Sequence, residues 1–323
     1  MKPMKLVQAL ALTTLFGTGA LTGAFAQEKV RIGVNPVSSS LPLYVGVAQG
    51  YFKEEGLELE PTQLIGGPPN VAALISGQID VASNLTTIDA ANAQLKKPGV
   101  AIYIAINSQN RTYQMEQFVV RAGLDVKTIA DLKGKKIMSA PGPANMTMAR
   151  AVLRANGLKD GDYTLDQLDL GQHINALTAG TFDAAYTLEP AGAVLRKSGA
   201  AVTLEAGLVA KYVLGDPEAN AWIAGTAMSS DFLNAKPEAA KKFAAAWAKS
   251  IDFIEKNPAE ARKSLLKNTL TPPDVVDSVP IVKFVMATKL TDKDVADFQK
   301  FIDFSSTSGI LSDKVDVKLL LKR

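Results

Sequence analysis

Residues that commonly carry enzyme chemistry are scarce in this chain. Its 323 residues include no cysteine and a single histidine, His173. The chain therefore has no thiol nucleophile, disulfide, zinc–thiolate site or multi-histidine metal site. No serine motif accompanies His173, and we expect it at the surface or at a helix cap. Asp160-Gly161-Asp162 resembles the start of a calcium loop but lacks the further oxygen ligands, which indicates a simple turn.

One loop has the features of an anion-binding site. Residues 139–145, SAPGPAN, separate a β-rich run from the helical run NMTMARAVLRANGL. The first backbone N–H groups of a helix have no partner within it, and they attract anions. Residues 35–41 occupy the same position in an earlier unit, which favours a ligand-facing role over an ordinary strand-to-helix turn. Neither loop has the glycine and lysine spacing that holds nucleotide phosphates.

Polar side chains elsewhere are candidates for the same ligand. Arg111 and Gln114 lie in the polar stretch SQNRTYQ, and the guanidinium of Arg111 offers parallel donors to a sulfonate or carboxylate. The alternative is a solvated or surface-paired arginine. Tyr186 and Glu189 follow a predicted strand. Glu189 either accepts hydrogen bonds from the ligand or locks the hinge, and an acidic ligand favours the hinge role because two facing negative charges are costly.

The first 26 residues have the pattern of an export signal. Lys2 and Lys5 precede an apolar run over residues 6–16, and AFA at 24–26 forms a small-x-small cleavage site. Loss of these two lysines takes the formal net charge from +3 to +1, so charge does not favour nucleic acid or an anionic membrane as a partner. We expect a periplasmic protein that begins at Gln27.

Short β-rich runs alternate with helical runs, the pattern of parallel sheets with helical crossovers. One unit, A-L-x-x-G-x-x-D-x-A, occurs at residues 73–82 and again at 176–185. In each copy a helix ends on a glycine, which adopts the left-handed conformation at low cost, and a strand follows. With 47% hydrophobic residues, the chain is long enough for two cores. We expect two similar lobes, with chance similarity as the alternative.

Local patterns predict several elements. We expect a strand over residues 30–34, a helix over 41–56 and a loop over 66–69. Thr291 and Asp294 have the spacing of a capping box at a helix start. Trp222 and Trp247 are expected to be packing residues.

Two facing lobes would enclose one cleft, because ligands bind beyond the carboxyl ends of parallel strands. We expect the chain to cross between lobes around residues 107–114 and to return around 224–229. The first lobe then contains residues 27–110 and 229–323, and the second contains 111–228. The expected ligand-binding residues are Asn35, Ser39, Ser40, Leu41, Gly67, Ser83 and Asn84 from the first lobe and Arg111, Gln114, Ser139, Pro141, Ala144, Asn145, Tyr186 and Glu189 from the second.

The chain also resembles a known family, the periplasmic solute-binding proteins of ABC importers for nitrate, sulfonates and taurine. The resemblance is carried by the segments SSSLPLYVGVAQGYFKEEGLELE, ALISGQIDVAS, ADLKGKKIMSAPGPA, TLEP and FSSTSGILSDKVDVKLLL. It implies an α/β periplasmic-binding-protein fold of type II, hinge closure on a small anionic ligand, and delivery to a membrane permease. Leu188 stands where the family often has an aromatic residue before Glu-Pro, which puts an aromatic platform at that place in doubt.

Three alternatives remain open at this point. The resemblance extends to pyrimidine synthases of thiamine biosynthesis, but those enzymes need a cysteine-rich patch, and this chain has no cysteine. A binding protein for a pyrimidine precursor of thiamine is a second alternative, and a binding protein that feeds a sensor is a third. We expect a monomeric, non-enzymatic binding protein with no cofactor or metal and no nucleic-acid partner.

Overall fold

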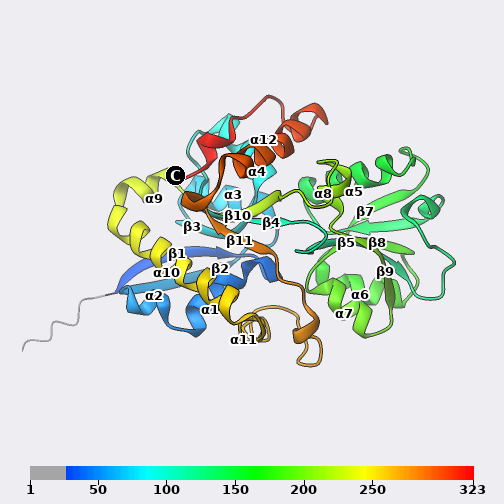
Figure 1. Cartoon of the computed structure of the whole chain (residues 1–323), viewed down its shortest axis with the longest axis horizontal. Coiled ribbons are helices and arrows are strands. Elements are labelled where there is room, and N and C mark those ends of the chain that lie inside the picture. Colours follow the sequence, from blue (N-terminus) through cyan, green and yellow to red (C-terminus); the bar gives the residue numbers. More distant parts are fainter. Residues whose placement is uncertain (1–26) are drawn as a thin grey trace, which may run out of the picture.

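The computed structural model describes residues 27–323, and their strands form two separate sheets. Figure 1 shows the two sheets in neighbouring lobes, each with helices on both of its faces. This confirms the expected two-lobed α/β fold. The expected export signal, residues 1–26, lies outside the described residues. Among the described helices, none combines the length and the apolar character needed to cross a membrane.

The first lobe is built on a six-stranded sheet with the order β11-β4-β10-β3-β1-β2. β1 pairs in parallel with β2 and β3, whereas β10 runs antiparallel to β3 and β4. The sheet is therefore mixed rather than purely parallel. Its strands are β1 (Glu28–Val34), β2 (Leu57–Gln63), β3 (Val81–Thr86), β4 (Ile102–Gln109), β10 (Ala221–Met228) and β11 (Lys283–Met286).

Helices cover both faces of this sheet (Figure 1). On one face, the aromatic rings of Phe52, Phe243 and Trp247 pack together. The ring centroid of Phe243 lies 5.0 Å from that of Phe52 and 5.6 Å from that of Trp247. The expectation that Trp247 is a packing residue is confirmed. The helices of this face are α1 (Leu41–Ala48), α2 (Tyr51–Glu54), α9 (Ser230–Ala235), α10 (Pro237–Lys256) and α11 (Pro258–Lys263), and those of the other face are α3 (Gly67–Ser76), α4 (Thr87–Lys96) and α12 (Asp292–Thr307).

The second lobe is built on a five-stranded sheet with the order β7-β6-β8-β5-β9. β6 is parallel to β7 and β8, and β5 runs antiparallel to β8 and β9. Its strands are β5 (Glu116–Arg121), β6 (Lys136–Ser139), β7 (Thr164–Gln167), β8 (Ala184–Leu188) and β9 (Ala201–Ala206), and its helices are α5 (Pro143–Ala155), α6 (Leu170–Thr178), α7 (Ala191–Lys197) and α8 (Leu208–Tyr212).

The repeated sequence unit forms the same structure in each lobe. Gly77 and Gly180 have φ angles of 69° and 71° after α3 and α6, as the helix-ending role requires. Each strand that follows is preceded by an aspartate that accepts a backbone N–H from the neighbouring strand: Asp80 from Arg31 at 2.9 Å, and Asp183 from Lys136 at 3.0 Å. The two lobes thus share one local design, and the expected internal similarity is confirmed.

Three local expectations need correction. The helix expected over residues 41–56 is interrupted between α1 and α2, because Gly50 adopts a φ of 78° that a continuous helix does not allow. The loop expected over residues 66–69 is short, since α3 already begins at Gly67 with prolines in its first turn. Since β10 belongs to the first sheet, the return crossing lies before Ala221 and not at residues 224–229. The capping box of Thr291 and Asp294 is confirmed.

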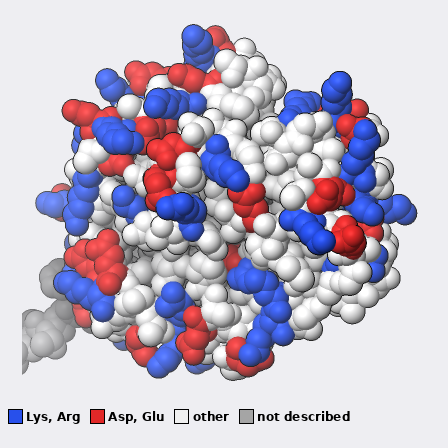
Figure 2. All heavy atoms as spheres, turned by 45° about the vertical axis from the view of Figure 1, so that its right-hand side comes forward, with Lys and Arg blue, Asp and Glu red and all other residues white. Residues whose placement is uncertain are grey.

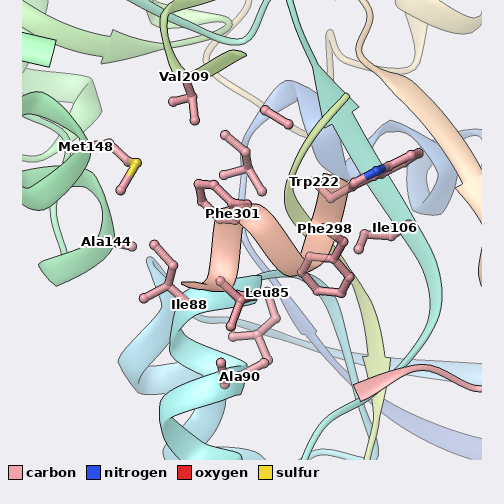
Figure 3. Close-up of a cluster of buried hydrophobic side chains, with 14 of the residues drawn as sticks. Leu85, Ile88, Ala90, Ile106, Ala144, Met148, Val209, Trp222, Phe298 and Phe301 are labelled. Atoms are coloured by element: carbon pink, nitrogen blue, oxygen red, sulfur yellow. The ribbon is translucent and has the colours of Figure 1, made fainter. Parts of the chain in front are cut away.

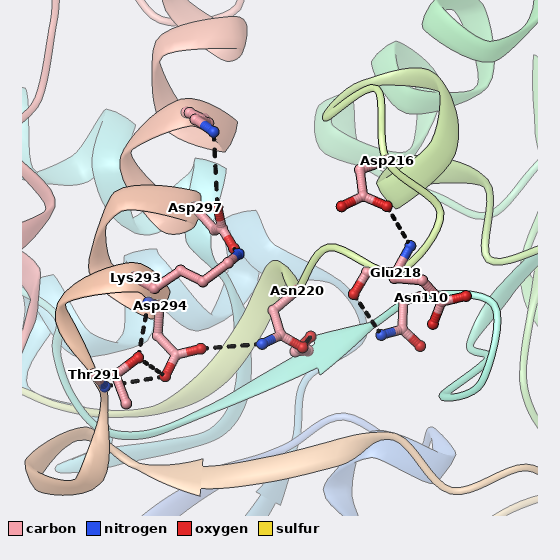
Figure 4. Close-up of polar contacts among 10 residues, drawn as sticks. Asn110, Asp216, Glu218, Asn220, Thr291, Lys293, Asp294 and Asp297 are labelled. Atoms are coloured by element: carbon pink, nitrogen blue, oxygen red, sulfur yellow. Dashed lines mark hydrogen bonds and ion pairs between the residues drawn. The ribbon is translucent and has the colours of Figure 1, made fainter.

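Polar contacts fix the two segments that cross between the lobes (Figure 4). Ser108 on β4 donates to Asn220 at 3.1 Å, and Asn220 donates to Asp294 on α12 at 3.0 Å. Asn110 donates to the backbone carbonyl of Glu218 at 3.3 Å. The outgoing and returning segments are therefore joined to each other and to the first lobe, which restricts relative motion of the lobes to the few residues between these contacts.

Charges of both signs are interspersed on the surface. Figure 2 shows Lys and Arg next to Asp and Glu over the whole face that it draws, separated by uncharged areas. On this face no large area of one sign attracts a polyanion or an anionic membrane.

Candidate functional site

A cleft lies where the two lobes meet, beyond the carboxyl ends of β1, β3, β6 and β8. Its volume is about 520 Å³ with the opening to solvent included. The expected position is therefore the observed one. Seven of the expected ligand-binding residues line this cleft, and they are Asn35, Ser39, Gly67, Asn84, Pro141, Ala144 and Asn145.

A larger hollow of about 1290 Å³, measured in the same way, opens on the first lobe between β1, β2, α1 and α2. Its walls are mostly apolar side chains such as Leu43, Phe52 and Leu59. No buried polar atom without a partner belongs to a residue that lines it. The interlobe cleft, which has convergent polar groups from both lobes, is the better candidate for a specific ligand site.

The start of α5 faces the cleft with free backbone donors. Gly142 caps the helix with a φ of 103°, and its N–H donates to Gln167 at 2.8 Å. Pro143 has no N–H, and the side chain of Asn145 donates to the carbonyl of Pro141 at 2.7 Å. Within residues 27–323, the backbone N–H groups of Ala144 and Asn145 have no backbone or side-chain acceptor. They are the donors available to a ligand at this helix start.

Other expected residues lie behind the cleft wall. Ser40 donates to the carbonyl of Asn35 at 2.7 Å, and Ser139 donates to the carbonyl of Ala140 at 3.0 Å. Leu41 is 1% exposed and belongs to the core of the first lobe. Ser83 is buried, and its hydroxyl has no partner within the described residues. These residues lie behind the residues that line the cleft and support them.

Arg111 and Gln114 do not line the cleft. The side chain of Arg111 is 69% exposed and forms an ion pair with Glu218, through Nε and Oε1. Gln114 donates to the backbone carbonyl of Arg111 at 3.0 Å. Both residues belong to the crossing segment, and the surface-paired alternative describes Arg111 in this arrangement.

Glu189 is fully buried within the second lobe. Its carboxylate accepts hydrogen bonds from Gln117 at 2.6 Å, from Arg196 at 2.9 Å and from the backbone N–H of Ala193 at 2.9 Å. Its backbone carbonyl accepts the N–H of Ser38 from the first lobe at 3.2 Å. Because the carboxylate of Glu189 accepts hydrogen bonds from its own lobe, it has a structural role in this arrangement rather than a role in accepting hydrogen bonds from the ligand.

The expectation of a surface or capping position for His173 is wrong. His173 is fully buried on α6, and its ring nitrogens lie 3.0 Å from the hydroxyl of Thr187 and 3.0 Å from the carbonyl of Leu168. Burial lowers the pKa of His173 to about 4, so the ring is neutral at pH 7. The apolar face of α6 places it in the interior, with both nitrogens hydrogen-bonded. The turn expected at Asp160-Gly161-Asp162 is confirmed.

Two carboxyl groups that sequence reasoning missed line the cleft. Glu116 begins β5 and Asp89 lies in the first turn of α4, in opposite lobes. Burial raises the pKa of Glu116 to about 8 and also raises the pKa of Asp89. The sequence contains one indication of the role of Glu116. This charged residue is the first of the strand run EQFVV, directly after the crossing segment.

The remaining cleft residues are uncharged, and Gly142 among them lies in the loop 139–145 that was expected to face the ligand. Most are polar side chains or apolar wall residues from the ends of strands: Val37, Gly66, Thr86, Asn107, Gln109, Met115, Gly142, Leu188, Ile223 and Ala224. No Lys, Arg or His lines the cleft in the described part of the chain. Over residues 27–323, no three His, Cys, Asp or Glu side chains are grouped in a way that could hold a metal ion.

Apolar side chains from both lobes meet beside the cleft (Figure 3). Ala144 and Met148 of α5 and Val209 of α8 belong to the same buried cluster as Ile88 of α4 and Phe301 of α12. Trp222 lies in this cluster near Phe298, and its full burial confirms the expected packing role. The lobes are therefore in direct contact at the edge of the cleft, as in a closed binding protein.

Comparison with solved structures supports this architecture. The chain superimposes on the alkanesulfonate-binding protein SsuA from Xanthomonas axonopodis pv. citri bound to MOPS with a TM-score of 0.73 and 21% identity, over 91% of this chain and 98% of that one. The nitrate-binding protein NrtA from Synechocystis PCC 6803 gives a TM-score of 0.67 and 15% identity, over 90% of this chain and 84% of that one. Identities this low establish the fold alone.

The sequence comparisons give the family. The taurine-binding periplasmic protein of Escherichia coli K12 is 28% identical over 225 residues, which cover 68% of this chain and 65% of that relative. Residues 37–261, more than half of the chain, match the family described as NMT1/THI5 like. With its two-lobed fold and interlobe cleft, this chain belongs to the NMT1/THI5-like family.

Proposed function

We propose that this protein is the periplasmic solute-binding component of an ABC importer. It captures a small anion of the sulfonate, taurine or nitrate type, or a related organic acid, and delivers it to a membrane permease. Support comes from the family and from the two-lobed fold shared with solute-binding proteins. The relative named for taurine and the solved neighbours named for alkanesulfonate and nitrate support the ligand class.

The observation that carries this proposal is the open start of α5 in the interlobe cleft. The backbone N–H groups of Ala144 and Asn145 are free to receive an anionic group, and the positive end of the helix dipole favours it. Contacts from the facing lobe stabilise the closed state, so binding drives hinge closure. The protein acts as a monomer that binds one solute per chain without converting it.

Filling the helix start tests this proposal. Ala144 lines the cleft and is 6% exposed, so Ala144→Trp places an indole where the ligand's anionic group would lie. We expect the affinity to fall by at least about 100-fold, together with a loss of about 1 to 3 kcal/mol in the stability of the unliganded protein, because Ala144 also packs in the buried cluster between the lobes. Isothermal calorimetry and thermal shift with taurine, ethanesulfonate and nitrate measure both quantities.

Arg111→Ala is the matched control. Because Arg111 is exposed and paired with Glu218 outside the cleft, its removal leaves the affinity within about twofold, as expected for an exposed ion pair. Unchanged binding by Ala144→Trp contradicts the proposed site, and so does a tenfold loss with Arg111→Ala.

A further inference from the structure

We propose that the solute captured in the cleft carries an amino group, and that Glu116 is the residue that accepts its hydrogen bond. This inference rests on the proposed function, because it assigns the chemistry of the ligand to the same cleft. It makes Glu116 a specificity-determining residue, which selects amino-bearing solutes over nitrate or a plain alkanesulfonate.

The charge of the cleft is the first reason. Glu116 from the second lobe and Asp89 from the first are the ionisable side chains that line it, and no basic side chain of the described residues joins them. A ligand with only negative charge faces two carboxyl groups without a cation between them. A ligand with an amino group supplies N–H donors and, when protonated, the missing positive charge.

The second reason is that one carboxyl oxygen of Glu116 has no hydrogen bond among the described residues. The residue is 3% exposed, and its Oε2 is buried without a hydrogen bond. The side chains of Gln109 and Tyr186 lie near the carboxyl and partly offset the rise of its pKa, but neither forms a hydrogen bond to Oε2 among the described residues. A buried acceptor left unpaired is costly, and a donor from the ligand relieves this cost.

The other acidic residues near the cleft differ from Glu116. Asp89 accepts the hydroxyl hydrogen of Thr86 and packs against Gly67 at the start of α3. Glu189 accepts three hydrogen bonds from its own lobe. An internal partner therefore holds each of these two carboxylates, whereas Glu116 is left for the ligand.

Two kinds of solute share this chemistry. An aliphatic zwitterion such as taurine combines an amino group for Glu116 with an anionic group for the N–H donors of Ala144 and Asn145. An amino-substituted pyrimidine, the alternative ligand class raised by the sequence, offers an exocyclic amino group together with ring nitrogens that accept hydrogen bonds. In both, the amino nitrogen is the feature that Glu116 recognises.

Pairs of compounds that differ in one amino group test the inference. Taurine is compared with ethanesulfonate, β-alanine with propionate, and 4-aminopyrimidine with pyrimidine, by calorimetry on the full mature chain. We expect the amino member of at least one pair to bind at least 10-fold more tightly than its partner. The pair that shows this preference distinguishes the zwitterion from the aminopyrimidine.

Glu116→Gln measures the contribution of the carboxyl group. The preference should fall below threefold in this variant and remain unchanged in Glu238→Gln, which alters an exposed glutamate on α10. Equal or tighter binding of the compounds without an amino group overturns the inference but leaves the proposed function in place. A preference that survives Glu116→Gln overturns the assignment to Glu116. If no compound of any pair binds, the inference fails, and the proposed function fails with it if nitrate does not bind either.

Proton release gives a readout that does not depend on the variant. At pH 7 a protonated amine that binds to Glu116 displaces the proton that burial holds there, since the pKa in the empty cleft is about 8. The other titratable or charged groups near β5 include Tyr186 on β8, Asp89 across the cleft, Glu189 and Arg196 next to Gln117, Arg121 paired with Asp183, and Glu205 paired with Lys211. Calorimetry of taurine in phosphate and in Tris should therefore report proton release, and proton uptake overturns the inference.

Discussion

The starts of α3 and α5 are two versions of one local structure. Each helix is preceded by a glycine with positive φ, Gly66 at 82° and Gly142 at 103°, and each has proline in its first turn. Both starts line the cleft, from opposite lobes. They differ in what faces them, because the carboxylate of Asp89 packs against Gly67 at the start of α3, whereas the start of α5 has no such group.

This difference explains why, of two similar helix starts, we expect an anion to bind at the start of α5 and not at the start of α3. At α3 the positive end of the helix dipole is offset by a carboxylate of the protein, and Pro68 and Pro69 remove two of the first N–H donors. At α5 only Pro143 lacks an N–H, and Ala144 and Asn145 keep theirs free. Of two equivalent positions, one is internally neutralised and the other is open to an anion.

The largest expected effect is on the free energy of unfolding. It comes from Glu116, the cleft residue whose Oε2 has no hydrogen bond among the described residues. Its pKa of about 8 in the folded protein lies above the ordinary glutamate value of 4.5, so between these values the unfolded chain releases a proton that the folded chain retains. Stability therefore falls as pH rises through this window, by about 3 kcal/mol at pH 7. Glu116→Gln, which cannot ionise, should be more stable than the native protein by up to about 3 kcal/mol at pH 7 and equal to it near pH 4.

Urea unfolding at the two pH values measures this difference. The internally partnered Glu189 provides the comparison, since Glu189→Gln loses charged hydrogen bonds to Arg196 and Ala193 and should destabilise the fold at pH 7. A Glu116→Gln variant that is less stable than the native protein at pH 7 would contradict an unpartnered carboxyl at this position.

Alanine at the two glycines should separate space from conformation. A Cβ at Gly67 would overlap the carboxylate of Asp89, whereas a Cβ at Gly142 meets no atom within 4 Å but requires a φ of 103°. We expect Gly67→Ala to cost about 2 kcal/mol by overpacking and Gly142→Ala to cost about 1 kcal/mol by backbone strain. Thermal unfolding checks both values. Removal of the carboxylate should relieve the cost at Gly67 in the double variant Gly67→Ala/Asp89→Ala, whereas Asp89→Ala should leave the cost of Gly142→Ala unchanged.

The sequence predicted this architecture well for a physical reason. The repeated A-L-x-x-G-x-x-D-x-A unit encodes helix, turn and strand by local rules, and glycine at 77 and 180 is required by a positive φ. The same rules placed the cleft at the strand ends and identified the loop before α5. Local rules fail where distant segments meet, as at β10, whose apolar strand pattern fits either sheet.

The charges of the cleft were beyond sequence reasoning for a similar reason. Asp89 and Glu116 are separated along the chain and by the lobe boundary, and only folding brings both to one cleft. The predicted surface position of His173 was wrong because a single polar residue in a sequence favours an exposed position. In the structure, two hydrogen bonds satisfy its ring nitrogens and allow its burial. Arg111 had an attractive residue type, but its surface partner Glu218 is over 100 positions away in the sequence.

The smallest expected effect comes from Asp89. Asp89→Asn keeps a hydrogen-bond acceptor for Thr86 but removes a negative charge from the cleft. Less repulsion should tighten the binding of ethanesulfonate by about two- to fivefold, in line with a screened interaction of about 1 kcal/mol or less. Competition calorimetry at low and high salt checks this, because the gain should shrink as salt rises. Weaker ethanesulfonate binding would mean that Asp89 supports the ligand directly.

Ligand binding at the start of α5 is tested most directly by a backbone amide NMR titration. The ligand is the tightest-binding of the compounds compared above. The Ala144 and Asn145 amide resonances should shift with the binding isotherm, because their N–H groups receive the ligand. The amide of Gly67, a residue that packs against the carboxylate of Asp89, should shift much less. A dominant shift at Gly67 with silent resonances at Ala144 and Asn145 would contradict the assignment of the ligand to the start of α5.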